Sequence, residues 1–222
     1  MTKPMPKPAL RIQQNLLAVS ERRLLNWLCA RLPAWLKPDH LTALGFTGAL
    51  VSASGYVLSN WHSGWLWFAI SGYFVNWFGD SLDGSLARFR KIERPSFGYF
   101  IDHSTDALAN TILVTCLGLS PFLRLDVALL ALAGYLLLSI HSFLAARVVN
   151  EFRLSYLAGG PTELRIVLIV MTLFMLGLGP MASHWPGFSV FDLFVGLIAF
   201  VLVTLYIVQT LTTAKSLRSS RD

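Results

Sequence analysis

Six apolar stretches, each close to the length of a membrane-crossing helix, constrain this chain more than any other feature of its sequence. They cover residues 41–58, 61–79, 97–119, 127–149, 164–181 and 188–211. The hydrocarbon core of a bilayer takes about 20 apolar helical residues to cross. With 55% hydrophobic and 14% charged residues, the chain of 222 residues is also too apolar for an ordinary soluble domain of this length. We therefore predict an all-α integral membrane protein with six transmembrane helices.

The basic residues predict how these spans are oriented. When the six spans are threaded back and forth, all of the 18 Lys and Arg residues except Arg124 fall on the side that holds both termini. Positively charged segments next to membrane spans face the cytoplasm. We expect both termini to face the cytoplasm, in a protein of the bacterial inner membrane. The net charge of +6 suits a surface that faces anionic lipid, and we do not interpret it as nucleic-acid binding.

The chain is expected to form one membrane domain with short flanking segments. Residues 1–15 lack the early apolar core of a signal peptide and are expected to form a disordered cytoplasmic tail. Residues 16–37 carry leucines on one helical face and arginines away from it, which predicts an amphipathic helix at the cytoplasmic interface. Packing of this helix against the protein's own loops is the alternative. The membrane domain would cover residues 38–213, with Asp39 capping the first span, and residues 214–222 would form a second cytoplasmic tail.

Aspartates interrupt the apolar pattern around the second and third spans: Asp80, Asp83, Asp102 and Asp106. The third span is long enough to cross a bilayer only if it begins near Phe97, so its two aspartates are expected at headgroup depth. The second helix is expected to continue past Gly79, which brings the other two to a similar level. Ionisable groups at this depth are costly unless they are neutralised and face the interior of the bundle.

Helical geometry predicts that these carboxylates converge. At about 100° per residue, each pair of aspartates falls on one face of its helix, and the two acidic faces oppose each other. Only cations can reconcile that arrangement, and oxygen ligands with a single histidine, His103, suit Mg²⁺ or Mn²⁺ better than zinc. Gly84 and Ala87 leave the same face open to a flat base or a phosphate. Arg88, one turn past Gly84, can donate hydrogen bonds to a phosphate.

At these positions the sequence resembles the CDP-alcohol phosphotransferases. Their signature, DxxDGxxAR followed by GxxxDxxxD, is matched at Asp80, Asp83, Gly84, Ala87, Arg88, Gly98, Asp102 and Asp106. The spacer between Arg88 and Gly98 holds nine residues where the family's usual pattern has eight. We expect this spacer to lie in a loop and to change the geometry only slightly.

The resemblance implies a membrane enzyme of phospholipid synthesis. In this family an alcohol hydroxyl attacks the β-phosphorus of a CDP-linked donor, CMP leaves, and a phosphodiester forms. The resemblance implies that four residues hold two divalent cations, Mg²⁺ or Mn²⁺: Asp80, Asp83, Asp102 and Asp106. It makes Asp106 the catalytic base as well. Contacts with the cytidine diphosphate would come from Gly84, Ala87 and Arg88, and we also expect a homodimer.

The choice of substrates stays open between two branches of the family. We prefer CDP-diacylglycerol as the donor, because a lipid-borne diphosphate can reach carboxylates at headgroup depth with its acyl chains still in the bilayer. The alternative is transfer from CDP-choline or CDP-ethanolamine to diacylglycerol, which the segments DHSTD and GGPTEL weakly resemble. A divalent cation transporter is a distant alternative from another class, although transporters usually bind ions near the bilayer midplane.

Candidates for the acceptor pocket lie near the cytoplasmic ends of the fourth and fifth spans: Arg147, Arg153, Glu163 and Arg165. The competing interpretation is that the three arginines only set the topology and that Glu163 caps the fifth span.

Overall fold

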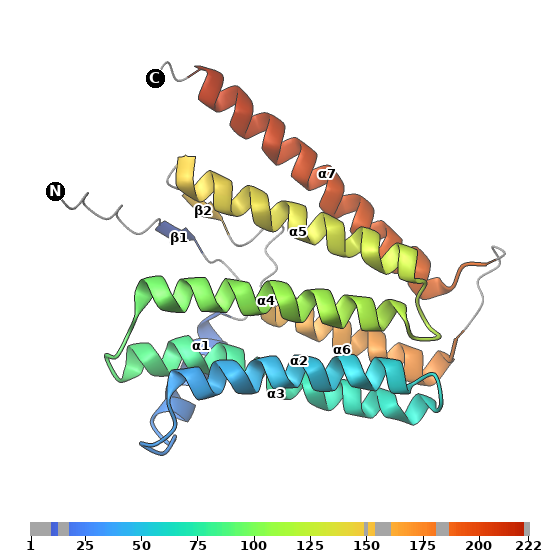
Figure 1. Cartoon of the computed structure of the whole chain (residues 1–222), viewed down its shortest axis with the longest axis horizontal. Coiled ribbons are helices and arrows are strands. Elements are labelled where there is room, and N and C mark those ends of the chain that lie inside the picture. Colours follow the sequence, from blue (N-terminus) through green and yellow to red (C-terminus); the bar gives the residue numbers. More distant parts are fainter. Residues whose placement is uncertain (1–9, 13–17, 149–150, 154–160, 181–186, 220–222) are drawn as a thin grey trace.

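A computed structural model describes residues 10–12, 18–148, 151–153, 161–180 and 187–219 of the chain. These residues form a bundle of helices that run roughly alongside one another (Figure 1). The elements are β1 (Leu10–Ile12), α1 (Ala18–Cys29), α2 (Pro38–Leu58), η1 (Ser63–Trp65), α3 (Leu66–Phe89), α4 (Pro95–Gly118), α5 (Leu125–Val148), β2 (Glu151–Arg153), α6 (Pro161–Leu178) and α7 (Val190–Ser219). The two short strands form a parallel pair in which Leu10 is opposite Glu151. The regular structure of the described residues is therefore helical apart from this pair.

Each of the long helices α2 to α7 overlaps one of the six predicted apolar stretches, although α3 begins only at Leu66 and α7 continues to Ser219. Helix α3 continues past residue 79 to Phe89, as expected from the sequence, and α4 begins at Pro95, slightly earlier than expected. By length and composition alone, α2, α5, α6 and α7 are the helices in the described part of the chain that could cross a membrane. The remaining two long helices, α3 and α4, carry the four aspartates.

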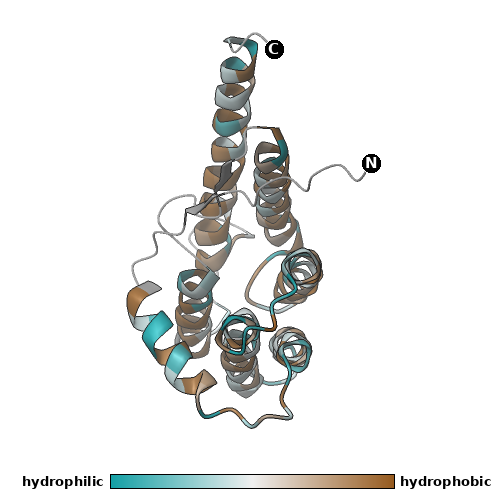
Figure 2. Cartoon of the chain, turned by 90° about the vertical axis from the view of Figure 1, so that its left-hand side faces the viewer, coloured by the Kyte–Doolittle hydropathy of each residue, from teal (hydrophilic) through white to brown (hydrophobic). Residues whose placement is uncertain are grey.

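The long helices consist largely of apolar residues (Figure 2), and many large apolar side chains are exposed on the outside of the bundle. On α7, for example, Leu197, Phe200 and Leu211 are each more than 60% exposed. A continuous apolar surface of this kind would be unfavourable in water, whereas lipid chains provide a suitable environment for it. The outward-facing residues thus support an integral membrane protein.

Glycines bring α2 and α3 into direct backbone contact. A Cβ atom on Gly48 would lie 2.3 Å from the backbone nitrogen of Asn76, and one on Gly79 would lie 2.2 Å from that of Gly45. The Asn76 side chain also donates a hydrogen bond to the Gly45 carbonyl oxygen at 2.9 Å. Small residues at such crossings are typical of membrane helices, because they allow close approach. This contact holds the beginning of α2 beside the aspartate-bearing end of α3.

Two apolar clusters complete the core. The larger one surrounds a buried set of hydroxyl groups in which the Tyr56 hydroxyl lies 3.0 Å from that of Tyr73 and 2.6 Å from that of Thr172. These bonds join α2, α3 and α6. The smaller cluster packs α1 onto α2 and α3 through Leu25, Cys29, Leu41, Leu82 and Leu86. Helix α1 therefore packs against α2 and α3, whereas the alternative considered from the sequence was packing against the protein's own loops.

The first turn of α2 differs from the expectation that Asp39 caps it. The N-cap is Lys37, and Asp39 lies inside the first turn, where it pairs with Arg94. The reason is Pro38, whose fixed φ and missing N–H suit the first helical position and leave the cap to the preceding residue.

The spacer between Arg88 and Gly98 is only partly a loop, because the turn is confined to residues 90–94. Of the tail predicted over residues 1–15, residues 10–12 form β1, and the others lie outside the described residues.

Candidate active site

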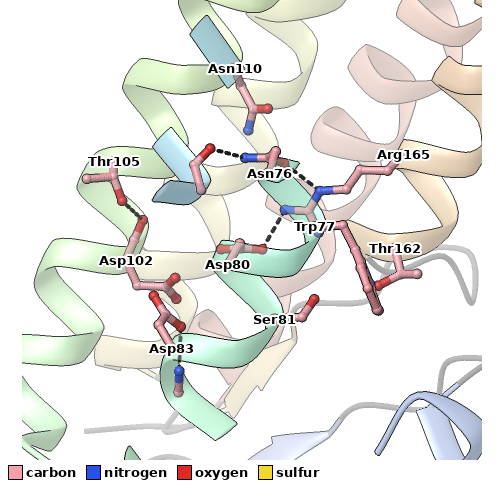
Figure 3. A network of polar contacts seen from close by, with 12 residues as sticks. Asn76, Trp77, Asp80, Ser81, Asp83, Asp102, Thr105, Asn110, Thr162 and Arg165 are labelled. Atoms are coloured by element: carbon pink, nitrogen blue, oxygen red, sulfur yellow. Dashed lines mark hydrogen bonds and ion pairs between the residues drawn. The ribbon is translucent and has the colours of Figure 1, made fainter. Parts of the chain in front are cut away.

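The four aspartates project from α3 and α4 at the end of the bundle that also holds α1. Asp83 from α3 and Asp102 from α4 point toward one another, with Asp80 beside them (Figure 3). Asp80 and Asp106 line a cavity of about 10 Å³ together with Asn76 and Thr105. The structure therefore brings all four carboxylates to one site.

The α4 side of the site includes a histidine. Ligand atoms of Asp102, His103 and Asp106 all lie within 4.8 Å of one another. The His103 Nδ1 atom is 3.3 Å from a carboxylate oxygen of Asp102, and the ring packs against Tyr99 at a centroid distance of 4.3 Å. His103 is the single histidine of this segment, and the sequence analysis does not include it among the cation ligands. Its position directly after Asp102 is the sequence feature that could have indicated a place at the site.

On the α3 side, each aspartate is held by a residue from another helix or from its own turn. Asp83 accepts a hydrogen bond from the Thr42 hydroxyl of α2 at 2.6 Å and another from the backbone N–H of Gly84. Asp80 accepts a hydrogen bond from the Arg165 guanidinium of α6 at 2.5 Å. Thr42 was not predicted, because nothing in the local pattern of PDHLT indicates a contact with α3.

Of the acceptor-pocket candidates, Arg165 is the one for which the structure shows a contact with one of the four aspartates, Asp80. Its Nε atom donates to the Asn76 side-chain oxygen at 2.7 Å, in addition to the bond with Asp80. The side chain is 12% exposed, and its buried Nη1 atom has no hydrogen-bond partner among the described residues. A buried guanidinium N–H without an acceptor favours a site for an anionic group.

The other acceptor-pocket candidates lie on α5, β2 and α6. Arg147 is exposed in the last turn of α5, and Glu163 is half-buried in the first turn of α6. Arg153 belongs to β2, but its side chain lies outside the described residues.

The residues predicted to bind cytidine diphosphate lie on the next turns of α3. A Cβ atom on Gly84 would lie 3.3 Å from the Nη1 atom of Arg88, so the guanidinium extends over the bare backbone of that glycine. Arg88 is exposed and donates to the Ser85 hydroxyl at 3.3 Å. Ala87 is half-buried beside it. This surface is open and offers a cationic donor group close to the carboxylates.

The donor set fits divalent cations of the magnesium type. Within the described part of the chain, the Arg165 guanidinium pairs with Asp80, and the His103 ring lies beside Asp102. Asp106 is close enough to Asp80, Asp83 and Asp102 for their negative charges to interact. The cluster therefore carries more negative charge than its protein partners neutralise, and its carboxylate oxygens are hard ligands of the kind that Mg²⁺ and Mn²⁺ prefer. The small cavity between Asp80 and Asp106 has room for about one water-sized ligand.

Comparison with known proteins identifies the family. A model of the CDP-alcohol phosphatidyltransferase family matches residues 35–214. The chain belongs to this family. The matched region contains the four aspartates, Gly84, Ala87 and Arg88, and it begins after α1. CDP-alcohol phosphatidyltransferases use divalent cations, and the Asp102, His103 and Asp106 group is a possible place for one here.

One relative in the family is the archaetidylinositol phosphate synthase of Methanothermobacter thermautotrophicus. It is 31% identical to this chain over 118 residues, which cover 53% of this chain and 56% of the relative. The similarity thus extends over about half the length of each protein.

Proposed function

We propose that this protein is a phospholipid-synthesis enzyme that transfers a substituted phosphate group from a CDP-linked donor to an alcohol hydroxyl and releases CMP. The observation that carries this proposal is the convergence of Asp80, Asp83, Asp102 and Asp106 from two helices, inside the region that matches the family. An open surface with Arg88 lies next to them, where a nucleotide diphosphate can bind.

The four aspartates would hold two divalent cations, Mg²⁺ or Mn²⁺, which would supply positive charge to the diphosphate of the donor. Asp106 takes the proton of the acceptor hydroxyl on a carboxylate oxygen. The hydroxyl oxygen forms a bond to the β-phosphorus, and the bond from that phosphorus to the bridging oxygen breaks, so that CMP leaves with the electron pair. Arg88 binds the cytidine diphosphate together with the flat surface at Gly84 and Ala87.

The donor that we propose is CDP-diacylglycerol or a lipid of the same type. The name of the archaeal relative describes synthesis of a lipid-linked inositol phosphate, which favours transfer of a lipid-bearing phosphate to a polar alcohol. Transfer from CDP-choline or CDP-ethanolamine to diacylglycerol is the competing reaction, since the carboxylate chemistry is the same in both.

We propose that the acceptor alcohol carries a negative charge. The buried Nη1 atom of Arg165 supports this, because an acceptor phosphate would provide the missing hydrogen-bond partner. Arg147, Arg153 and Glu163 are further candidates for the same pocket.

We further propose that α2 to α7 all cross the membrane, that residues 38–213 form the membrane domain, and that the segment 16–37 lies at the interface. The basic residues favour a cytoplasmic active site and cytoplasmic termini in a bacterial inner membrane. A homodimer stays a prediction, which light scattering of the purified protein in detergent would test.

The deciding experiment supplies the purified protein and Mg²⁺ with each radiolabelled donor in turn. The acceptor panel consists of glycerol phosphate, serine, inositol phosphate, phosphatidylglycerol and diacylglycerol. We expect CMP release and labelled lipid from CDP-diacylglycerol with a phosphorylated alcohol. Label that moves only from CDP-choline or CDP-ethanolamine into lipid would favour the competing reaction. If no donor releases CMP while vesicles containing the protein take up Mn²⁺, the cation transporter interpretation would be correct.

A further inference from the structure

One carboxylate oxygen of Glu21 connects α1 to two other helices beside the active site. The Glu21 Oε1 atom accepts hydrogen bonds from the Trp77 indole N–H at 3.0 Å and from the Thr162 hydroxyl at 2.7 Å. The Ser81 hydroxyl lies farther away, at 3.4 Å. Trp77 and Ser81 belong to α3, and Thr162 belongs to the first turn of α6. A single side chain of α1 therefore joins the aspartate end of α3 to the beginning of α6.

The contacts of Glu21 lie next to those of Arg165, on the same turns of α3 and α6. Thr162 and Arg165 are three residues apart on α6, so their side chains extend from neighbouring positions on the helix surface. Asn76 and Asp80, which Arg165 contacts, are the residues immediately before Trp77 and Ser81 on α3. Figure 3 shows Trp77, Ser81 and Thr162 next to Asp80 and Arg165. The bond from Glu21 to Thr162 thus restrains the turn of α6 from which Arg165 reaches the aspartates.

The segment that follows α1 is attached to the end of α3, so α1 has contacts with the bundle at both of its ends. The Arg90 guanidinium at the end of α3 donates hydrogen bonds to the carbonyl oxygens of Leu32, Pro33 and Leu36 at 3.1, 2.9 and 2.6 Å. Leu25 and Cys29 are buried against Leu82 and Leu86 between these two attachments. Charge-assisted hydrogen bonds of this kind are stronger than neutral ones.

We propose that Glu21 is a positioning residue that sets the first turn of α6 against α3, so that Arg165 reaches Asp80 and the acceptor. Glu21 lies before residues 35–214, which match the family model, so this role belongs to the N-terminal helix of this chain. The proposal rests on the proposed function, because its activity readout needs turnover of a CDP-linked donor.

The test compares Glu21→Ala, Glu21→Gln and Thr162→Val with a matched control, Glu93→Ala, which removes an exposed carboxylate at the same end of the bundle. We expect Glu21→Ala and Thr162→Val to lower kcat at least about tenfold, since small displacements of a positioning group have large effects on rate. The donor KM should change little. Glu21→Gln keeps the Oε1 acceptor and should retain most activity, and Glu93→Ala should behave as the wild type.

A double-mutant cycle separates positioning from general stability. In an Arg165→Ala background, Glu21→Ala should add less than about a twofold loss, because residues that act through one contact are not additive. An equal loss in both backgrounds would overturn the proposal. The same conclusion would follow if Glu21→Ala and Thr162→Val matched the Glu93→Ala control.

Hydrogen–deuterium exchange provides a readout that does not depend on activity. Glu21→Ala should speed exchange of the amides at residues 161–168 relative to the Glu93→Ala control, and Thr162→Val, a nearly isosteric change, should do the same if the alanine variant folds poorly. Unchanged exchange in Thr162→Val would overturn the proposal. If the wild type releases no CMP from any donor while this exchange does increase, the proposed function fails and the positioning role stands.

Discussion

At the scale of single residues, substitution of Asp106 is expected to affect turnover much more than affinity for the donor. Asp106→Asn preserves the size of the side chain but removes the proposed proton acceptor, so turnover should fall at least about a hundredfold. Affinity for the CDP-linked donor should change much less, since three of the four carboxylates and Arg88 are intact. CMP release gives the turnover, and calorimetric titration with the donor gives the affinity.

The matched control is Asp126→Asn, which changes an aspartate whose side chain is 63% exposed at the opposite end of the bundle. It should leave both quantities unchanged. If Asp106→Asn loses donor binding together with turnover, Asp106 serves mainly as a cation ligand and another group is the base.

At the scale of helices, the contact between α2 and α3 positions Asp80 and Asp83. The Cβ atom introduced by Gly79→Ala would lie 2.2 Å from the Gly45 backbone nitrogen, so the two helices would have to separate. Overpacking of this kind costs about 1–3 kcal/mol, and the displacement of the neighbouring Asp80 should also lower turnover. Thermal unfolding in detergent and the CMP assay measure the two effects. Gly177→Ala, whose added Cβ has no atom within 4 Å among the described residues, should not destabilise α6.

At the scale of the whole molecule, the acidic site should make stability depend on divalent cations. Chelation with EDTA should abolish turnover and lower the unfolding temperature, and Mg²⁺ or Mn²⁺ should restore both. A ligand at a hundred times its Kd stabilises the folded state by about 2.7 kcal/mol. Asp80→Asn and Asp83→Asn should weaken this response, whereas Asp126→Asn should respond as the wild type. Full activity in excess chelator would exclude the proposed cation site.

The sequence by itself determined which segments form the long helices and which helices carry the aspartates. Both properties are local. The length of an apolar stretch sets a span, and the spacing of residues along a helix sets the face that they share. For that reason the aspartates of α3 and α4 could be selected before the structure was known, and Arg88 could be assigned to the turn beyond them.

Only the tertiary structure decided which residues from other helices complete the site. Thr42 reaches Asp83 across 41 positions, Arg165 reaches Asp80 across 85, and Glu21 reaches Thr162 across 141. Helical periodicity cannot indicate such contacts, because they depend on how helices pack and rotate against one another. Here the packing follows from the glycine contacts between α2 and α3 and from the attachment of α1 to the bundle. The sequence left Arg165 in a group of four candidates and did not indicate Glu21. The packing of α1, α3 and α6 brings Arg165 to Asp80 and places Glu21 against Trp77 and Thr162 beside it.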